Sequence, residues 1–379
     1  MKVVYCLNSL STFGGIETVT ITKANWLANN PDNQIWIVAC CDDSLKTCIP
    51  LSDKVGFLGI KNRITWRFPW NIIQLIFKRA ELKRELGQIL FQINPDILIS
   101  TGEVEKWVLP YIKGNWSLIR EVHFVKDFRK RDISSPKDRL LTPLANILDY
   151  SFNIKSFHHI VVLTQDDKIK NWRNHYNISV IPNPIRFNLL SRSTQENKRI
   201  LSIGRLVYAK NFSSLLRVFS LVVKQYPEWR LDIYGMGPDY EQLQSEIVSY
   251  GLLSSVRLMG INPRIEEALP KYSIFACSSR FEGQSMAILE AMACGLPIVS
   301  YDCPYGPRSV IRDSIDGFLV PPGEETTMAD RICQLAGDIS LRKRMGTSAL
   351  ERSKDYRIER IGKMWEELFQ QLNNGSHAK

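Results

Sequence analysis

Short apolar runs rich in valine and isoleucine recur along the chain, with longer amphipathic stretches between them. In the first half the runs are "VVYCL", "IWIVAC", "VGFLG", "ILIS", "SLIREVH" and "HIVVLT". Helix-like patterns over residues 16–29, 71–93 and 165–174 separate several of them. Strands that are apolar throughout and alternate with helices indicate a parallel sheet that is covered on both faces.

The alternation pauses once, at "SVIPNPIRFNLLSRSTQENKRI", and resumes with "ILSIG", "RLDIYG", "VRLMG", "IFACS", "IVSY" and "GFLVP". The sequence therefore predicts two doubly wound, Rossmann-like α/β domains, at residues 1–185 and 186–355. We expect residues 356–379 to form a C-terminal helix that packs back on the first domain, followed by a frayed tail. Ligands of open α/β sheets bind at the carboxyl ends of the strands, so the two domains should face a central cleft.

The composition is that of a globular protein, with 44% hydrophobic and 23% charged residues among 379. The longest uncharged apolar segment, "FPWNIIQLIF", is far shorter than the ~18 residues of a membrane span, and the start has no long apolar signal region. We therefore expect a cytoplasmic protein. Its eight cysteines include no C-x-x-C pair, which favours small core residues over a zinc site or disulfides.

The charge of +10 is concentrated in the first half, where residues 1–190 carry a net +8. Two stretches stand out, at residues 61–86 and 126–139. The first interleaves seven Lys or Arg with Trp, Phe, Ile and Leu, and we expect it to contact an anionic membrane surface. The second is suited to an anionic group such as a diphosphate. An ordinary core-facing helix with a solvated basic face is the structural alternative.

Cations follow the first strand of the second domain. In "ILSIGRLVYAKNF", Arg205 and Lys210 lie in the loop directly after the strand. A planar guanidinium and a compact ammonium five residues apart suit a diphosphate group. Solvated surface cations are the alternative for this pattern taken by itself.

A second motif, "FEGQSMAILEAMACGLPIVS", contains Glu282 in a loop and Glu290 on the helix that follows. Four residues offer backbone amides at the start of this helix: Gly283, Gln284, Ser285 and Met286. Glu290 shares its helix face with Met286, Ala287 and Ala293, so we expect that face to be buried. A buried carboxylate without a partner is costly, which favours a polar ligand such as a vicinal diol. A backbone cap or a local salt bridge is the alternative.

The first half contributes two further candidates. Gly14 and Gly15 lie between the first strand and the first helix, where backbone amides can approach an anion. A tight strand–helix turn explains the same residues equally well. In "LIREVHFVKD", His123 follows a strand together with Glu121, and we expect its neutral ring to exchange a hydrogen bond with a ligand. A core histidine whose hydrogen bonds are satisfied within the protein is the alternative.

Taken together, these motifs resemble those of the retaining glycosyltransferases of family 4. The resemblance is densest over residues 199–325, in "GRL", the following Lys, the Glu-x7-Glu pair and "GLPIVS", and it extends more weakly to "GGIE", "REVH" and "IPNP". It implies a GT-B fold and a nucleotide-sugar donor. The stretch "YDCPYGPRSVI" looks like the subgroup that builds bacterial surface polysaccharides, often from UDP-sugars.

The resemblance also implies roles for the residues named above. Arg205 and Lys210 would bind the donor diphosphate, Glu290 the ribose, and Glu282 with the 283–286 amides the transferred sugar. Gly15 would meet the donor, and His123 would lie beside the reacting sugar. Asn262, in the turn "MGINP", would frame the nucleobase. The loop after Glu282 reads "GQSM" where many members have Gly-Phe-Gly, which leaves the donor sugar open.

The expected activity is thus transfer of a hexose with retained configuration to a glycan or a polyprenyl-diphosphate-linked acceptor, in capsule, O-antigen or exopolysaccharide synthesis. No D-x-D motif occurs, and we expect no metal and no cofactor. One alternative is a sugar-nucleotide epimerase on the same fold. The other is a basic, non-enzymatic protein that binds nucleic acid; the buried character of the strands disfavours it, because single-strand platforms need exposed aromatic and basic side chains. We expect no nucleic-acid partner.

Overall fold

The computed structural model of the protein describes residues 1–11, 14–41, 47, 49–61, 72–124, 146–186 and 191–376. The chain divides into two compact units. Unit 1 consists of Met1–Arg186 with Ile358–Lys379, and unit 2 consists of Phe187–Arg357. The units therefore meet in sequence one residue after the expected boundary, and the C-terminal segment belongs to unit 1.

Unit 1 is built on a seven-stranded parallel sheet with the order β3-β2-β1-β4-β5-β6-β7. Its strands are β1 (Lys2–Leu7), β2 (Gln34–Ala39), β3 (Val55–Gly59), β4 (Ile97–Ser100), β5 (Ser117–Val122), β6 (His159–Val162) and β7 (Ile178–Val180). The strand order reverses between β1 and β4. This arrangement is that of a doubly wound fold.

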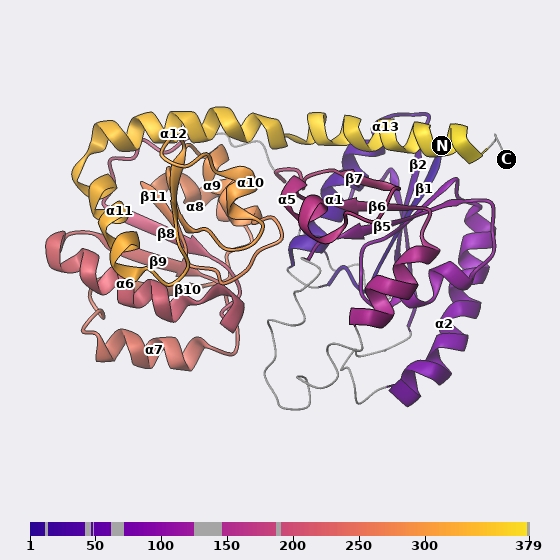
Figure 1. Ribbon diagram of the computed structural model, residues 1–379, viewed down its shortest axis with the longest axis horizontal. Coiled ribbons are helices and arrows are strands. Elements are labelled where there is room, and N and C mark those ends of the chain that lie inside the picture. Colours follow the sequence, from indigo (N-terminus) through magenta and orange to yellow (C-terminus); the bar gives the residue numbers. More distant parts are fainter. Residues whose placement is uncertain are drawn as a thin grey trace. The chain divides into compact units, whose positions relative to one another are not determined.

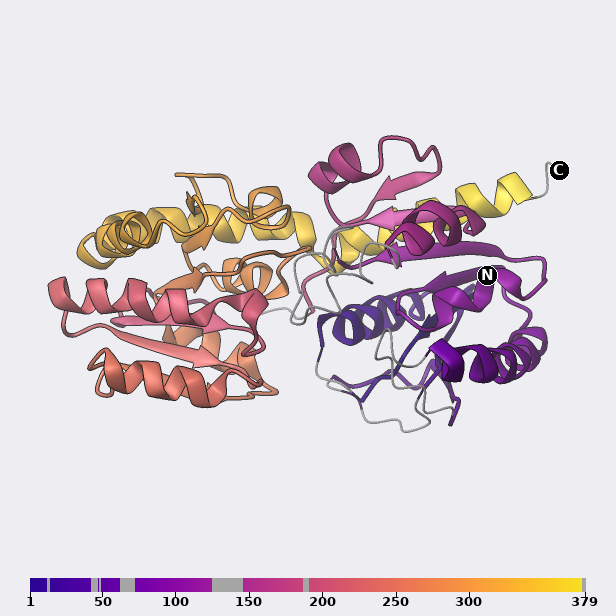
Figure 2. The same ribbon diagram turned by 60° about the horizontal axis from the view of Figure 1, so that its bottom comes forward.

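Helices cover both faces of this sheet (Figures 1 and 2). They are α1 (Gly15–Leu27), α2 (Ile72–Ile93), α5 (Gln165–Asn171) and α13 (Ile358–Ser376), with short turns η1 (Glu105–Trp107), η2 (Leu109–Tyr111), η3 (Leu148–Phe152) and η4 (Asn153–Ser156). Alternate residues of β1 point to opposite faces: Tyr5 joins the core under α1 and α13, and Cys6 joins the core under α2.

The C-terminal helix α13 packs on α1 and supplies Trp365 and Phe369 to the core of unit 1. Gly362 makes this close approach possible, because a Cβ atom there would lie 2.2 Å from the indole ring of Trp26. A segment from the far end of the sequence is thus an integral part of the first sheet's cover.

Unit 2 repeats the architecture with a six-stranded parallel sheet in the order β10-β9-β8-β11-β12-β13. Its strands are β8 (Arg199–Ile203), β9 (Arg230–Tyr234), β10 (Val256–Gly260), β11 (Ile274–Cys277), β12 (Ile298–Tyr301) and β13 (Gly317–Val320). The predicted pair of doubly wound parallel sheets is therefore confirmed.

The helices of unit 2 are α6 (Phe212–Gln225), α7 (Tyr240–Ser249), α8 (Ile265–Ala268), α9 (Met286–Ala293), α10 (Pro307–Val310), α11 (Glu325–Gly337) and α12 (Ile339–Ser353), with turns η5 (Tyr208–Lys210), η6 (Leu269–Lys271) and η7 (Lys354–Tyr356). The connection from β8 to β9 moves toward one edge of the sheet, and the connection from β11 to β12 moves toward the other edge. Because both crossovers are right-handed, their helices, α6 and α9, lie on opposite faces of the sheet.

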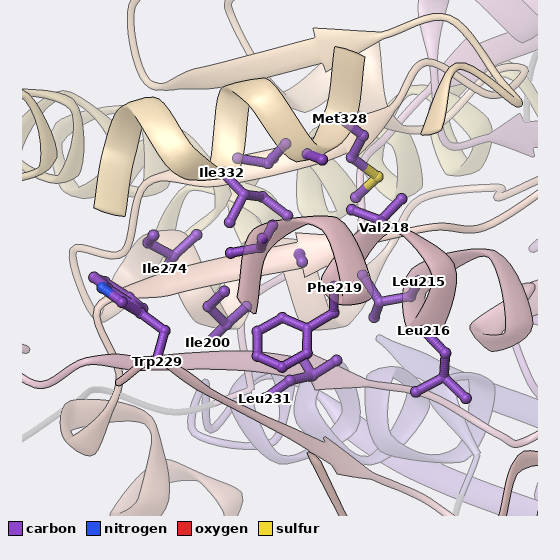
Figure 3. Close-up of a cluster of buried hydrophobic side chains, with 14 of the residues drawn as sticks. Ile200, Leu215, Leu216, Val218, Phe219, Trp229, Leu231, Ile274, Met328 and Ile332 are labelled. Carbon is purple, nitrogen blue, oxygen red and sulfur yellow. The ribbon is translucent and has the colours of Figure 1, made fainter. Parts of the chain in front are cut away.

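The main core of unit 2 lies between α6, α11 and the sheet (Figure 3). Phe219 and Leu215 of α6 and Ile332 of α11 meet strand residues such as Leu231 and Ile274. The loops that follow these strands are therefore held on a rigid base.

We expect Phe219→Ala to lower the free energy of unfolding of unit 2 by ~3–5 kcal/mol, because its ring is 1% exposed and its loss leaves a cavity. Chemical denaturation measures the change. Leu221→Ala, on the same helix but 38% exposed, is the control and should cost far less. Equal losses would contradict this description of the core.

One difference from the sequence prediction concerns unit 1. Strand β7 falls where the pattern was interpreted as a pause; it has three residues and ends before Pro182, too short to produce a periodic signal. The basic stretch 126–139 and residues 62–71 of the other basic stretch lie outside the described residues. The described part of α2 is a core-facing helix, with Leu82 and Leu86 buried and Lys83 exposed.

Candidate active site

The candidate site of unit 2 lies where the strand order reverses, between β8 and β11. The loop after β8 carries Arg205 and Lys210, and the loop after β11 carries Glu282. Since β8 and β11 are adjacent and parallel, both loops leave the same edge of the sheet. Doubly wound sheets bind their ligands at this place.

Lys210 and Glu282 are in direct contact. The ammonium donates to Glu282 Oε1, which also accepts a hydrogen bond of 2.7 Å from the Ser279 hydroxyl. The side chains are 24% and 11% exposed, so the pair borders solvent without being fully open to it. Burial lowers the pKa of Lys210, but the Glu282 carboxylate outweighs burial, and the net shift is upward. Lys210 therefore keeps its positive charge.

The two loops are fastened to each other through Arg280. Its backbone amide donates to Ala209 O at 2.8 Å, and its guanidinium donates to Asn211 Oδ1 at 2.7 Å. The guanidinium also stacks over the Tyr208 ring at 4.3 Å. Ser278 Oγ adds a bond of 2.9 Å to Lys210 O. The backbone that carries Lys210 is thus held to the loop that carries Glu282.

A third loop, after β12, supports Glu282 from the other side. The Glu282 carbonyl accepts from the Tyr305 amide at 3.2 Å, and the Glu282 amide donates to Pro304 O at 3.3 Å. Gly306 lies so close that a Cβ atom there would be 2.7 Å from Gly283 O. Only glycine allows this approach without a shift of the backbone.

Glu290 is 6% exposed on α9. Its three neighbours on the same face, Met286, Ala287 and Ala293, are only half-buried, which corrects the expectation of a wholly buried face. Glu290 therefore lies at the inner edge of a partly open surface. Gly283, Gln284 and Ser285 precede the helix, with Ser285 at the N-cap. The amides of a helix's first turn have no intrahelical partners and can bind polar groups.

The remaining predicted residues of unit 2 occupy less enclosed positions. Arg205 is exposed immediately after β8. Asn262 is half-buried in the turn after β10, the edge strand, where its side-chain oxygen accepts from the Arg264 amide at 3.0 Å. Lys210 and Glu282 are thus brought together directly, whereas Asn262 follows a strand separated from β8 by β9.

In unit 1, Gly14 is the N-cap of α1 and Gly15 is its first residue. The Gly14 carbonyl accepts from the Thr18 amide at 3.2 Å and from its hydroxyl at 2.9 Å. This turn follows β1, one of the two strands at the switch point of the first sheet.

His123 lies just beyond β5, with a side chain that is 4% exposed. Its Nε2 is 3.4 Å from Glu121 Oε1. Glu121 in turn is bound by Lys23 of α1, whose Nζ lies 2.5 Å from both carboxylate oxygens. The sequence reasoning missed Lys23. Its signal is a single lysine in the middle of "TVTITKANWL", an otherwise uncharged stretch of α1.

The described residues contain no group of three or more His, Cys, Asp or Glu side chains placed to hold a metal ion. Within that same part of the chain, no helix is both long and apolar enough to cross a membrane.

Comparison with known proteins bears on the second unit first. Residues 190–352 match the family model described as glycosyl transferases group 1. Residues 190–352 are thus similar in sequence to the group 1 glycosyltransferases. This match covers nearly all of unit 2, including both loops at the switch point.

Relatives extend the likeness to the whole chain. An uncharacterised glycosyltransferase of Haemophilus influenzae is 26% identical over 370 residues, 96% of this chain and 98% of that protein. The amylovoran biosynthesis glycosyltransferase AmsD of Erwinia amylovora is 33% identical over 218 residues, 55% of this chain and 61% of AmsD. The chain thus matches less than two thirds of the length of some curated relatives.

Among solved structures, the Anabaena protein HepE, in complex with UDP and glucose, has a TM-score of 0.74 and 17% sequence identity, covering 98% of this chain and 100% of HepE. At this identity the likeness shows the fold alone. Together with the two parallel sheets, it establishes the GT-B fold.

Proposed function

We propose that this protein is a retaining glycosyltransferase of family 4 that moves a hexose from a UDP-sugar to a glycan or lipid-linked acceptor during synthesis of a bacterial surface polysaccharide. The main support for this proposal is the Lys210–Glu282 contact, which lies at the switch point of the sheet within the region that matches the group 1 glycosyltransferases. The relatives support the pathway: AmsD is named for amylovoran biosynthesis, and another relative, from Salmonella typhimurium, is a lipopolysaccharide 1,6-galactosyltransferase.

In this proposal the donor diphosphate lies over the loop after β8. Arg205 and Lys210 bind its oxygens, and their charge offsets the negative charge that develops as the sugar departs. Electrostatic stabilisation of this kind is usually the largest single contribution to catalysis. Because Glu282, which accepts a hydrogen bond from Ser279, holds the Lys210 ammonium in place, little reorganisation is needed when the charge appears.

Sugar and ribose are assigned to the next loop and helix. The buried carboxylate of Glu290 accepts hydrogen bonds from the two ribose hydroxyls, and hydrogen bonds to a charged acceptor are stronger than those between neutral groups. Glu282 and the amides of 283–286 bind hydroxyls of the transferred sugar, and the Asn262 turn frames the base.

The transfer step is proposed to occur on one face of the sugar. The bond between C1 and the diphosphate oxygen breaks, and the acceptor oxygen forms a new bond to C1 on the same side. The acceptor's proton passes to the departing phosphate oxygen, so no protein nucleophile is required. No cofactor enters the proposal; activity in excess EDTA tests whether a divalent cation takes part.

Contact with an anionic membrane is the remaining element of the proposal. It rests on the net +8 of residues 1–190, which would bring the enzyme to a lipid-linked acceptor on the inner face of the cell membrane.

The decisive experiment is calorimetric titration with UDP, GDP and several UDP-sugars. We expect UDP to bind the wild type, and Glu290→Gln to weaken it by about 10- to 100-fold, the equivalent of ~1.5–3 kcal/mol for hydrogen bonds to a charged group. Glu351→Gln, an exposed glutamate of unit 2, is the control and should bind like the wild type. Failure of every nucleotide to bind the folded wild type would refute the proposal.

A further inference from the structure

Three buried ionisable side chains form a chain across unit 1. Lys23 belongs to α1, Glu121 to β5, and His123 follows β5. Lys23 Nζ lies 2.5 Å from both oxygens of Glu121, and His123 Nε2 lies 3.4 Å from Glu121 Oε1. The exposed fractions of the Lys23, Glu121 and His123 side chains are 1%, 1% and 4%. Burying charges at such a position is costly, and replacing the group by apolar residues is often neutral for stability. A role beyond stability is therefore worth testing.

Two aromatic rings also contact the Lys23 ammonium. Nζ lies 4.4 Å from the ring centroid of Trp365, on α13, and 5.3 Å from that of Tyr5, on β1. Both contacts are in the range of cation–π attraction. The ammonium is thus enclosed by the carboxylate of β5, the ring of Tyr5 on β1 and the ring of Trp365 on α13. One of these three groups therefore comes from the C-terminal helix.

This enclosure keeps the negative charge on Glu121. Burial by itself would raise the pKa of the carboxyl group, but Lys23 and His123 together lower it to about 2. The Tyr5 hydroxyl stays neutral, because burial and the Glu121 charge both raise its pKa. His123 therefore faces a carboxylate whose charge Lys23 already compensates.

The geometry also decides which imidazole nitrogen can serve a ligand. Nε2 of His123 is buried and makes no hydrogen bond within the described residues; it lies 3.4 Å from Glu121 Oε1, so it has no access to a substrate. A neighbouring carboxylate favours the tautomer whose proton points toward it. With the proton on Nε2, Nδ1 carries the lone pair and accepts a hydrogen bond.

We propose that Lys23 and Glu121 are positioning residues for His123: Glu121 holds the proton on Nε2, and Lys23 balances the Glu121 charge so that the ring stays neutral and Nδ1 accepts from a sugar hydroxyl. The contact of His123 with the sugar rests on the proposed function. The tautomer and the charge of the ring do not depend on that function, so they can be tested separately from the sugar contact.

The first test is 15N NMR of the imidazole groups at pH 7, which distinguishes both neutral tautomers from the protonated ring. The chain has five histidines, and the spectrum of His123→Gln assigns the signal of His123. We expect the Nε2–H tautomer in the wild type. In Lys23→Met, Glu121 has lost its balancing cation, and we expect the ring to become protonated. Lys54→Met, an exposed lysine of unit 1, is the control and should leave the signal unchanged.

The second test is the pH profile of sugar transfer. Because a carboxylate that has lost its balancing cation favours the protonated ring, the ratio of kcat/KM at pH 8.5 to that at pH 6.5 should be higher in Lys23→Met than in the wild type. A merely structural lysine would lower the rate equally at both pH values.

Because Lys23→Met leaves a buried carboxylate, the double variant with Glu121→Gln provides a second route if the single variant fails to fold. It removes both charges, and we expect a neutral ring with a mixture of tautomers. An Nδ1–H tautomer in the wild type, an unprotonated ring in Lys23→Met, or the wild-type tautomer in the double variant would each overturn the inference. The predicted NMR pattern in a protein that binds no nucleotide would instead overturn the proposed function and leave the positioning intact.

Discussion

Replacing Lys210 by methionine is expected to lower kcat for sugar transfer by ~10²–10³-fold, the loss typical of removing one group that stabilises developing charge in a transition state. The methionine keeps much of the side-chain volume and removes the ammonium that contacts Glu282. Steady-state kinetics with a radiolabelled donor measures the effect. The loss should appear mainly in kcat, because the charge on the diphosphate increases in the transition state.

Lys198→Met is the matched control for this prediction. Lys198 also belongs to unit 2 and also pairs with a glutamate, Glu228, at 3.1 Å, but both side chains are largely exposed at 58% and 42%. Exposed pairs of this kind contribute ~0–1 kcal/mol, so neither rate nor stability should change much. A folded Lys210→Met enzyme with nearly normal kcat would remove Lys210 from the transition state.

Asp149→Asn is expected to lower the free energy of unfolding of unit 1 by ~3–5 kcal/mol, because it leaves buried cations without their counter-charge. Asp149 is fully buried and binds Lys106 at 2.7 Å and Arg120 at 2.5 Å. Lys106 is itself fully buried, and it also pairs with Glu103, whose side chain is 36% exposed. Urea denaturation followed by hydrogen exchange at the β5 amides measures the loss where it occurs.

The control is Asp53→Asn, the same substitution at an exposed site of unit 1, which should change stability by no more than ~0.5 kcal/mol. A loss below ~1 kcal/mol in Asp149→Asn would show that Glu103 or water compensates both cations. The activity of the folded fraction should then be close to that of the wild type, since the proposed site does not use Asp149.

Local sequence patterns were sufficient for the architecture. Apolar strands alternating with helices predicted two parallel sheets, which the structure confirms. Arg205, Lys210 and Glu282 follow β8 and β11, and the pairing of these two strands brings their loops to one edge of unit 2. The reason is that parallel strands present their carboxyl ends at one side, whatever the rest of the chain does. The same reasoning missed β7, because a strand of three residues is too short to show a recognisable hydrophobic periodicity.

What the sequence could not supply is the partner of each charged side chain. Glu282 was expected to bind a sugar, and in the folded protein it also contacts Lys210, which is 72 residues away in the sequence. The sequence did not predict a role for Lys23, although in the folded protein it contacts Glu121, 98 residues away, and the ring of Trp365. Periodicity tells which face of an element a residue occupies, but contacts between elements depend on how the faces pack. The sequence by itself determined the sheets and the loops at their edges; the tertiary structure alone decided which charges meet there.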